Sequence, residues 1–244
     1  RFDSSYAHDL PVRAMSVAIR ATGCVPDNHD AMTDGAAGAQ PARLPTGRLD
    51  AFSDGVFAIA ITLLVLEISV PAGSENDLLD AVGDQWRSYL AYVVSFSTIG
   101  ALWLAHSAIT RYLAGANALL IRINLLLLLV VSFLPFPTRL LAEYSEPDDA
   151  ARVATTMYGL TIFAAAVLTA VLWRYALHAG LVDPDASGAE VESLTNQVTP
   201  GLAGYLVMIA LGLFLPTAAV IGYLLLALYL IVPFGLIQAT RAKL

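Results

Sequence analysis

The stretch Arg48–Ile68, RLDAFSDGVFAIAITLLVLEI, decides the fold of this chain. Residues 56–66 carry no charge, whereas Arg48, Asp50 and Asp54 precede them. About twenty residues at about 1.5 Å each make a helix roughly 30 Å long, which is the thickness of the hydrocarbon core of a bilayer. The stretch therefore predicts a helix that spans a membrane.

The composition of the whole chain agrees with a membrane protein. Of its 244 residues, 57% are hydrophobic and 14% are charged, and the mean hydropathy is +0.68. Soluble domains have about 45–50% and about 25% respectively. The net charge is −7, but much of the acid lies in loops and in the N-terminal tail, so membrane lipid and no nucleic acid is the expected partner. Cys24 is the only cysteine, which excludes an internal disulfide and a cysteine-rich metal site.

Apolar stretches predict further spans over residues 86–106, 123–141 and 153–173. Pro135 and Pro137 should kink or end the third span early. A nearly continuous apolar run then covers Gly201–Gln238, and as one helix it would be roughly 57 Å long. A bilayer cannot cover that length, so we expect the run to fold back near Pro216. The fold class predicted is an all-α membrane protein with six transmembrane helices per chain.

Residues outside the spans divide into a tail and polar connections. Residues 1–44 mix Ala, Gly, Asp and Pro without periodicity and are expected to form a flexible cytoplasmic tail, in part upstream or added sequence. Residues 45–244 are expected to form one six-helix transmembrane domain. The connections 71–85, 143–149 and 183–199 are expected to be polar loops. The acidic ones are either ordinary solvated loops or a means of raising cation concentration near a pore mouth.

The distribution of Lys and Arg predicts the orientation, because cytoplasmic loops carry an excess of both. Three cations fall on one side of the predicted spans: Arg87, Arg139 and Arg152. The other side receives Arg43, Arg48, Arg111, Arg122, Arg174, Arg241 and Lys243. Both termini are therefore expected to be cytoplasmic.

One motif at the start of the first span carries a resemblance to a known family. Arg48, Phe52, Ser53 and Asp54 form the pattern RxxxFSD and lead directly into the apolar run. The pattern and the run resemble the first helix of the potassium-channel family named for transmembrane protein 175, and a looser similarity extends to the C-terminus. The resemblance implies a symmetric homotetramer in which this helix lines a central pathway for K⁺. It also implies one six-helix repeat per chain here.

A stripe of side chains on the first span is the candidate pore surface. Ile59, Thr62, Leu63 and Leu66 fall at i, i+3, i+4 and i+7 and share one helical face. From spacing alone this is either ordinary helix packing or a set of rings that gate by dewetting. The resemblance implies a hydrophobic constriction at Ile59, Leu63 and Leu66, with potassium selectivity at Thr62. Glu67 is either a ring that attracts cations or an interfacial charge.

The charged start of the span needs polar partners, since a carboxylate inside a membrane is costly unless it is paired or wet. Trp103 and His106 on the second span and Asn124 on the third lie at the depth of Asp54 in the predicted topology. The resemblance implies that these residues, with Arg48, Phe52, Ser53 and Asp54, form the polar network that holds the pore helix. An Asp54–His106 proton relay is the alternative. His178 ends the fourth span, where a solvated helix end accounts for it.

No catalytic signature accompanies these residues. The sequence has no TVGYG-type filter, P-loop, HExxH or GxSxG motif and no histidine or acidic cluster spaced for a metal. We therefore expect no enzyme activity, no cofactor and no metal site. The functional prediction is passive, potassium-preferring conduction. The alternatives are a proton-coupled secondary transporter, a proton-permeable leak pathway, and a membrane-embedded enzyme or assembly factor.

Overall fold

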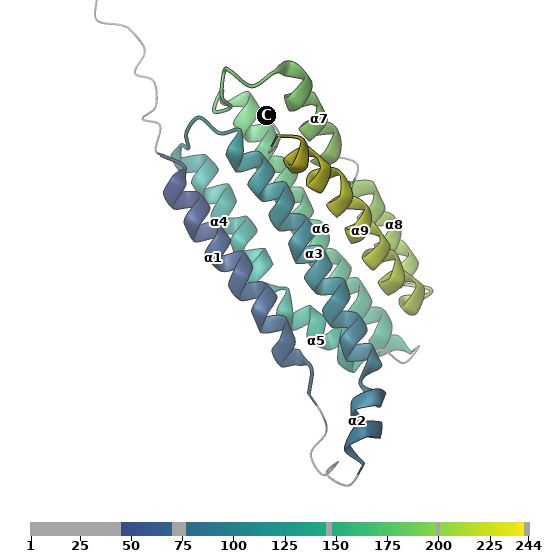
Figure 1. The fold of residues 1–244 in the computed structure, drawn as a ribbon. Helices are drawn as coiled ribbons and strands as arrows, with labels where there is room; N and C mark the ends of the chain where they lie inside the picture. Colours follow the sequence, from purple (N-terminus) through teal and green to yellow (C-terminus); the bar gives the residue numbers. More distant parts are fainter. Residues whose placement is uncertain (1–44, 70–76, 145–147, 199–200, 242–244) are drawn as a thin grey trace, which may run out of the picture. The chain divides into compact units, whose positions relative to one another are not determined.

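In the described part of the chain, all secondary-structure elements longer than an isolated bridge are helices. The computed structural model describes residues 45–69, 77–144, 148–198 and 201–241, with side chains as far as residue 232. In chain order the elements are α1 (Gly47–Leu63), the 3₁₀ helix η1 (Leu64–Glu67), α2 (Leu78–Asp84), α3 (Trp86–Arg111), α4 (Ala118–Phe133), α5 (Pro135–Glu143), α6 (Asp149–His178), α7 (Gly188–Val198), α8 (Gly201–Gly212) and α9 (Pro216–Arg241) (Figure 1). The all-α prediction is confirmed.

Four helical segments of the described chain are long and apolar enough to cross a membrane. They are Gly47–Glu67, Trp86–Arg111, Ala118–Glu143 and Asp149–His178. α8 has 12 residues and is roughly 18 Å long, and α9 is apolar over the part whose side chains are described, Pro216–Val232. The molecule is thus an all-helical membrane protein with four candidate spans, and six spans remain a proposal.

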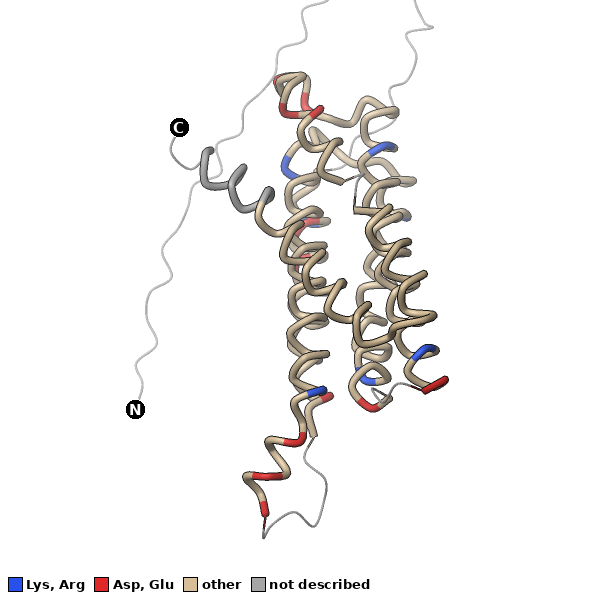
Figure 2. The backbone as a smooth tube through the Cα atoms, turned by 90° about the vertical axis from the view of Figure 1, so that its right-hand side faces the viewer, with Lys and Arg blue, Asp and Glu red and all other residues tan. Residues whose placement is uncertain are grey.

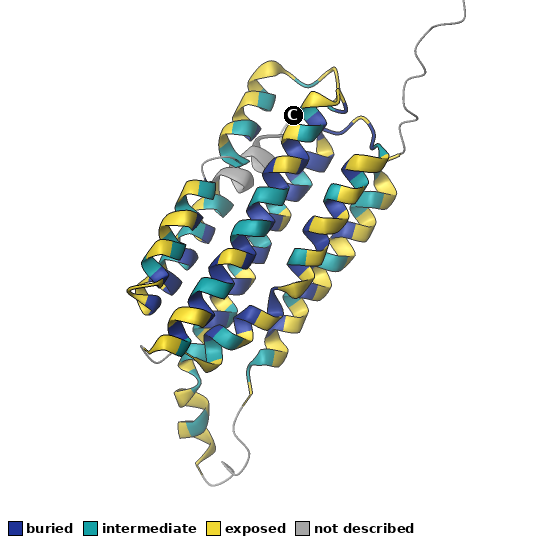
Figure 3. Ribbon diagram, turned by 180° about the vertical axis from the view of Figure 1, so that it is seen from behind, coloured by how far each residue is buried: buried dark blue, intermediate teal, exposed yellow. Residues whose placement is uncertain are grey.

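The helices pack side by side along their length (Figure 1). α1 contacts α3 and α4, α6 contacts α4 and α8, and α3 contacts both α5 and α9. Buried residues lie on the inward sides of the helices and exposed ones on the outward sides (Figure 3). Phe57 of α1 and Leu64 of η1 join a core cluster that includes Leu127 of α4 and Tyr158 of α6.

Charged residues gather toward the two ends of the helices (Figure 2). α1 and α4 begin, and α3 and α6 end, at one end, where the backbone N–H of Ala114 donates to the Leu181 carbonyl over 2.9 Å. Arg48, Arg111, Arg122 and Arg174 belong to this end. Arg43 and Lys243 of the orientation argument lie outside the described residues. The cytoplasmic assignment of this end remains a prediction.

The proline break in the third span falls where the sequence predicted it, at Pro135, whereas Pro137 lies in the first turn of α5. α4 ends at Phe133 and α5 begins at Pro135, because proline lacks the N–H that the helix ladder requires. The apolar run after Gly201 also folds back, as predicted. Its turn lies over Leu213–Leu215, and Pro216 is the first residue of α9, a position that proline favours.

Two of the predicted loops contain helices, which corrects the sequence prediction. α2 lies in the connection 71–85 and α7 in the connection 183–199. The signal for α7 was a capping box. The Ser187 hydroxyl accepts from the backbone N–H of Glu190 over 3.3 Å, and the Glu190 carboxylate accepts from the backbone N–H of Ser187 over 3.1 Å.

A buried polar cluster that the sequence did not predict joins α3, α5 and α6. Ser95 Oγ lies 2.7 Å from Thr138 Oγ1 and donates to the Tyr158 hydroxyl over 3.3 Å. Tyr158 donates in turn to Thr98 Oγ1 over 3.3 Å. All four side chains are buried. The cluster fixes α5, the segment after the proline break, against its neighbours.

We expect Tyr158→Phe to lower the free energy of unfolding by about 1–3 kcal/mol, because it removes the two buried hydrogen bonds that this hydroxyl makes with Ser95 and Thr98. Thermal unfolding of the purified protein in detergent measures this loss. Tyr229→Phe is the matched control, since Tyr229 lies on α9 and is 67% exposed. Equal unfolding midpoints for the two variants would contradict a stabilising role for the cluster.

Candidate functional site

α1 has one packed face and one uncovered face within a single chain. Its packed face consists of Ser53, Phe57, Ala60 and Leu64, all of which are buried. These positions recur at i, i+4, i+7 and i+11, as one face of an α-helix requires. The opposite face carries the side chains that the sequence proposed for the pore. The packing thus fixes which face of α1 is left free.

The uncovered face is mostly apolar, with one hydroxyl among aliphatic side chains. Ile59 is 60% exposed, Leu63 41% and Leu66 70%, and Thr62 is exposed as well. The Thr62 hydroxyl donates to the Ile59 carbonyl over 2.9 Å. Since that bond uses the only proton of the hydroxyl, the remaining lone pairs of Oγ1 can act only as acceptors.

A directional chain of hydrogen bonds holds the other face of α1. His106 Nε2 lies 2.7 Å from Asn124 Oδ1, the Asn124 amide donates to Ser53 Oγ over 3.0 Å, and Ser53 donates to the Leu49 carbonyl over 2.8 Å. His106, Asn124 and Ser53 are buried. Because the Asn124 amide nitrogen donates to Ser53, its oxygen faces His106, which requires a proton on Nε2. These hydrogen bonds tie α1 to α3 and α4.

Asp54 has a separate partner. Trp103 Nε1 donates to Asp54 Oδ1 over 2.8 Å, which satisfies the carboxylate without His106. The hydrogen bonds described for Asp54 and for His106 therefore lead to different residues, and none directly joins this pair. This geometry gives no support to the Asp54–His106 relay.

The remaining residues of the motif lie outside this hydrogen-bonded group. Arg48 and Phe52 are exposed, and among the described residues Arg48 has no ion-pair or hydrogen-bond partner. The structure therefore forms two groups: Asp54 pairs with Trp103, and Asn124 joins Ser53 to His106. It does not bring Arg48 or Phe52 to them. His178 ends α6 and is exposed.

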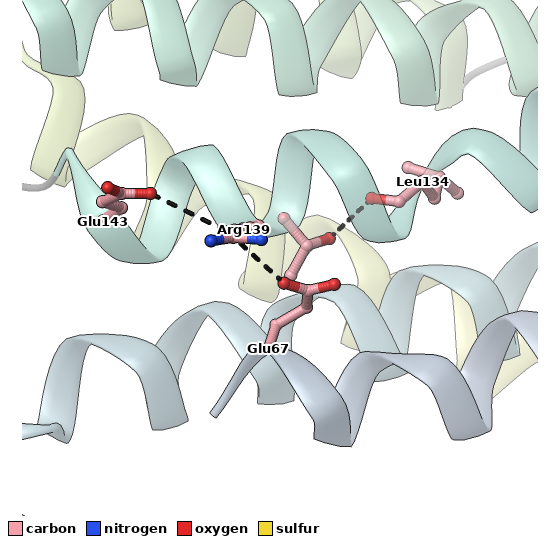
Figure 4. A network of polar contacts seen from close by, with 5 residues as sticks. Glu67, Leu134, Arg139 and Glu143 are labelled. Atoms are coloured by element: carbon pink, nitrogen blue, oxygen red, sulfur yellow. Dashed lines mark hydrogen bonds and ion pairs between the residues drawn. The ribbon is translucent and has the colours of Figure 1, made fainter. Parts of the chain in front are cut away.

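At the far end of α1 a second polar contact involves a residue that the sequence did not single out. Arg139 Nε of α5 lies 3.9 Å from Glu67 Oε2 and 3.8 Å from Glu143 Oε2 (Figure 4). The Glu67 side chain is 23% exposed, so it faces α5 more than open space. This favours the structural reading of Glu67. The i, i+4 spacing of Arg139 and Glu143 was the available signal.

Metal chemistry finds no support in the described part of the chain. No group of three or more His, Cys, Asp or Glu residues there could hold a metal ion. The features on which the site rests are an uncovered helical face and a buried hydrogen-bonded anchor. They define a multi-pass helical membrane protein whose candidate site is a surface of one span.

Comparison with known proteins identifies the family. A family model described as endosomal/lysosomal potassium channel TMEM175 matches residues 48–135. A potassium channel of Streptomyces collinus is 41% identical over 186 residues, which cover 75% of this chain and 90% of the relative. The chain belongs to the TMEM175 potassium-channel family. It is a member of an ion-channel family and is not an enzyme.

Two further relatives differ in how much they share with this chain. The crystal structure of a TMEM175 homologue from Chamaesiphon minutus, described as a lysosomal potassium-selective channel homologue, has a TM-score of 0.70 and 40% identity, covering 78% of this chain and 97% of its own. A TMEM175 protein of Gallus gallus, described as an endosomal/lysosomal proton channel, is 35% identical over 139 residues, which cover 53% of this chain and 28% of the relative. The bacterial relatives therefore match over nearly their whole length.

We expect Asn124→Leu to destabilise the protein by about 1–3 kcal/mol, because it leaves the buried Nε2 of His106 without its Asn124 partner and removes the bond to Ser53. The measurement is thermal unfolding in detergent, together with the yield of folded protein. Ser132→Ala is the control on the same helix, since Ser132 is exposed and, among the described residues, bonds only to the Leu129 carbonyl of its own helix. A stability loss no larger than that of the control would show that the anchor is dispensable.

Proposed function

We propose that this chain forms a potassium-preferring cation channel, a symmetric homotetramer in which α1 lines a central pore. In this proposal α8 and α9 complete six spans per chain, and both termini are cytoplasmic in the plasma membrane of a prokaryote. The bacterial relatives described as potassium channels support the activity. K⁺ is the permeant ion and no cofactor is needed.

The observation that carries the proposal is how little of α1 is covered by its own chain. In the most apolar part of this span 22% of the residues are buried, against 39–50% for the other three candidate spans. α1 bears the family motif and lies at the edge of its protomer. Such a position allows it to lie at the centre of an assembly of several copies. The anchor through Asn124 turns the stripe of Ile59, Thr62 and Leu66 toward that centre.

Small residues beside the stripe supply a surface for the neighbouring copy. Ala51, Gly55 and Ala58 fall at i, i+4 and i+7, on the flank of the helix next to Thr62 of the stripe, and all three are exposed. An added Cβ at Gly55 would meet nothing within 4 Å in the protomer. In membranes such small residues let helices approach closely. Copies of α1 could therefore pack around an axis with Ile59 and Leu66 facing inward.

The chemistry of the stripe matches selective conduction through side chains. Rings of Ile59, Leu63 and Leu66 would exclude water from a narrow pore unless it widens, which is gating by dewetting. A ring of Thr62 oxygens, whose protons are donated to the helix backbone, would face a dehydrated cation with lone pairs only. Such a ring can replace part of the hydration shell of K⁺.

Proton permeation is the second candidate, and one observation favours it. The relative from Gallus gallus that shares the motif-bearing region is described as a proton channel. A wetted pore lined by hydroxyls could pass protons as well as K⁺. Flux of both ions through the same pore would be compatible with the arrangement of α1, whereas a proton-coupled transporter would need a saturable site.

Ion flux in liposomes tests the channel proposal. We expect passive flux that prefers K⁺ over Na⁺ in the wild type. Ile59→Asn should raise the leak by about tenfold or more, since it wets the constriction. Thr62→Ala should reduce the preference for K⁺, and Thr62→Ser, which keeps the hydroxyl, should retain most of it.

The matched control on the same helix is Val65→Asn, because Val65 is 51% exposed but lies off the stripe. A pH-sensitive dye inside the same liposomes measures proton flux in parallel. Flux that saturates and requires a proton gradient would contradict the channel and favour the transporter. Equal effects of Ile59→Asn and Val65→Asn would contradict the assignment of the stripe.

A further inference from the structure

An apolar groove lies between α4 and α6, on a part of the molecule that the channel proposal does not use. Its volume is about 820 Å³. One wall is α4 and the other is α6, and Leu213 of the α8–α9 turn also borders it. The principal apolar lining residues are Leu129, Phe133, Val153, Met157, Leu160 and Ala164, and one cation, Arg152, borders the groove.

The groove has the length of one leaflet. From Arg152 near the start of α6 to Ala164 it extends by roughly 18 Å along the helix. The hydrocarbon core of a bilayer is about 30 Å thick, so half of it is about 15 Å. The groove therefore runs from the end of the bundle to about the middle of the membrane.

A pair of opposite charges stands at the mouth of the groove. Arg152 Nη1 lies 3.1 Å from Asp149 Oδ1, and both side chains are exposed, 51% and 95% respectively. The neighbouring Asp148 is engaged, since it caps α6 by accepting from the backbone N–H of Ala151 over 2.9 Å. Within the described residues, the mouth thus offers one guanidinium with further donors and one carboxylate with a second oxygen.

We propose that the groove binds a zwitterionic phospholipid with an ammonium headgroup. The phosphate contacts Arg152, the ammonium contacts Asp149, and the acyl chains fill the apolar lining down to Ala164. An anionic headgroup without the ammonium would bring a second negative charge next to Asp149 with no cation of its own, and it would bind less well. The proposal requires only that the chain spans a membrane, and it is independent of what the chain conducts.

Native mass spectrometry of the purified full-length protein tests this site. The protein is delipidated and offered equal amounts of phosphatidylethanolamine and phosphatidylglycerol with the same acyl chains. We expect the phosphatidylethanolamine adduct to be retained preferentially. Arg152→Ala should lower its retention about tenfold, since a hydrogen-bonded charge contact is lost. Arg152→Lys should keep most of the retention, and Asp149→Asn should remove the preference between the two lipids.

Two further variants separate the groove from the rest of the surface. Arg139→Ala removes a cation at the same end of the bundle but outside the groove, and it should leave lipid retention unchanged. Ala164→Trp fills the deep end and should lower retention without changing the oligomeric mass. Equal retention of the two lipids by the wild type, or no effect of Arg152→Ala, would overturn the proposal. So would loss of the oligomer with unchanged lipid retention in Ala164→Trp, because the groove would then be an interface between copies.

Discussion

The hydrogen bonds from His106 through Asn124 and Ser53 to the Leu49 carbonyl fix the rotation of α1, and the rest of the account depends on that rotation. In a membrane an apolar helix gains little by choosing one apolar neighbour over another, so polar contacts and close packing decide which face it buries. Ser53 supplies the contact, and Phe57, Ala60 and Leu64 supply the packing on the same face. The face with Ile59, Thr62 and Leu66 is therefore the one left uncovered.

Other polar contacts hold the elements next to α1, namely α5 and η1. The cluster of Ser95, Thr138 and Tyr158 fixes α5 after the proline break, and α5 in turn presents Arg139 to Glu67 at the end of η1. The first part of α1 is thus held by a buried series of hydrogen bonds, and η1, which follows it, by a half-exposed ion pair. The second contact is the weaker, because exposed ion pairs contribute about 0–1 kcal/mol.

Much of the fold could be predicted because hydropathy and proline act locally. The four long spans, the break at Pro135 and the fold-back before Pro216 all follow from runs of apolar residues and from the missing N–H of proline. α7 was missed although its capping box was readable, because its residues 188–198 are mostly polar and bury only Leu194. The number of spans stayed open because α8 is short.

The candidate site, like the fold, could be predicted only in part. A carboxylate at the start of a span has to find donors, so a partner such as Trp103 could be anticipated for Asp54 from depth alone. The pairing of donors with acceptors could not be anticipated, since the spacing of His106 and Asn124 says nothing about side-chain direction. The Ser95–Tyr158 contact was beyond sequence reasoning because nothing local connects two residues 63 positions apart. The roles of Ile59 and Thr62 remain predictions, because a single chain has no axis around which to measure a pore.

Access to position 59 from the ion pathway tests the central claim most directly. Cys24 is the only natural cysteine, so Ile59→Cys in a Cys24→Ser background carries a single thiol per chain. If α1 lines the pore, thiols of neighbouring copies bind a soft cation together, and Cd²⁺ should block K⁺ flux until a chelator removes it. The cysteine-free parent and Val65→Cys should be insensitive. Full K⁺ flux through Ile59→Cys in saturating Cd²⁺ would contradict a pore lined by α1.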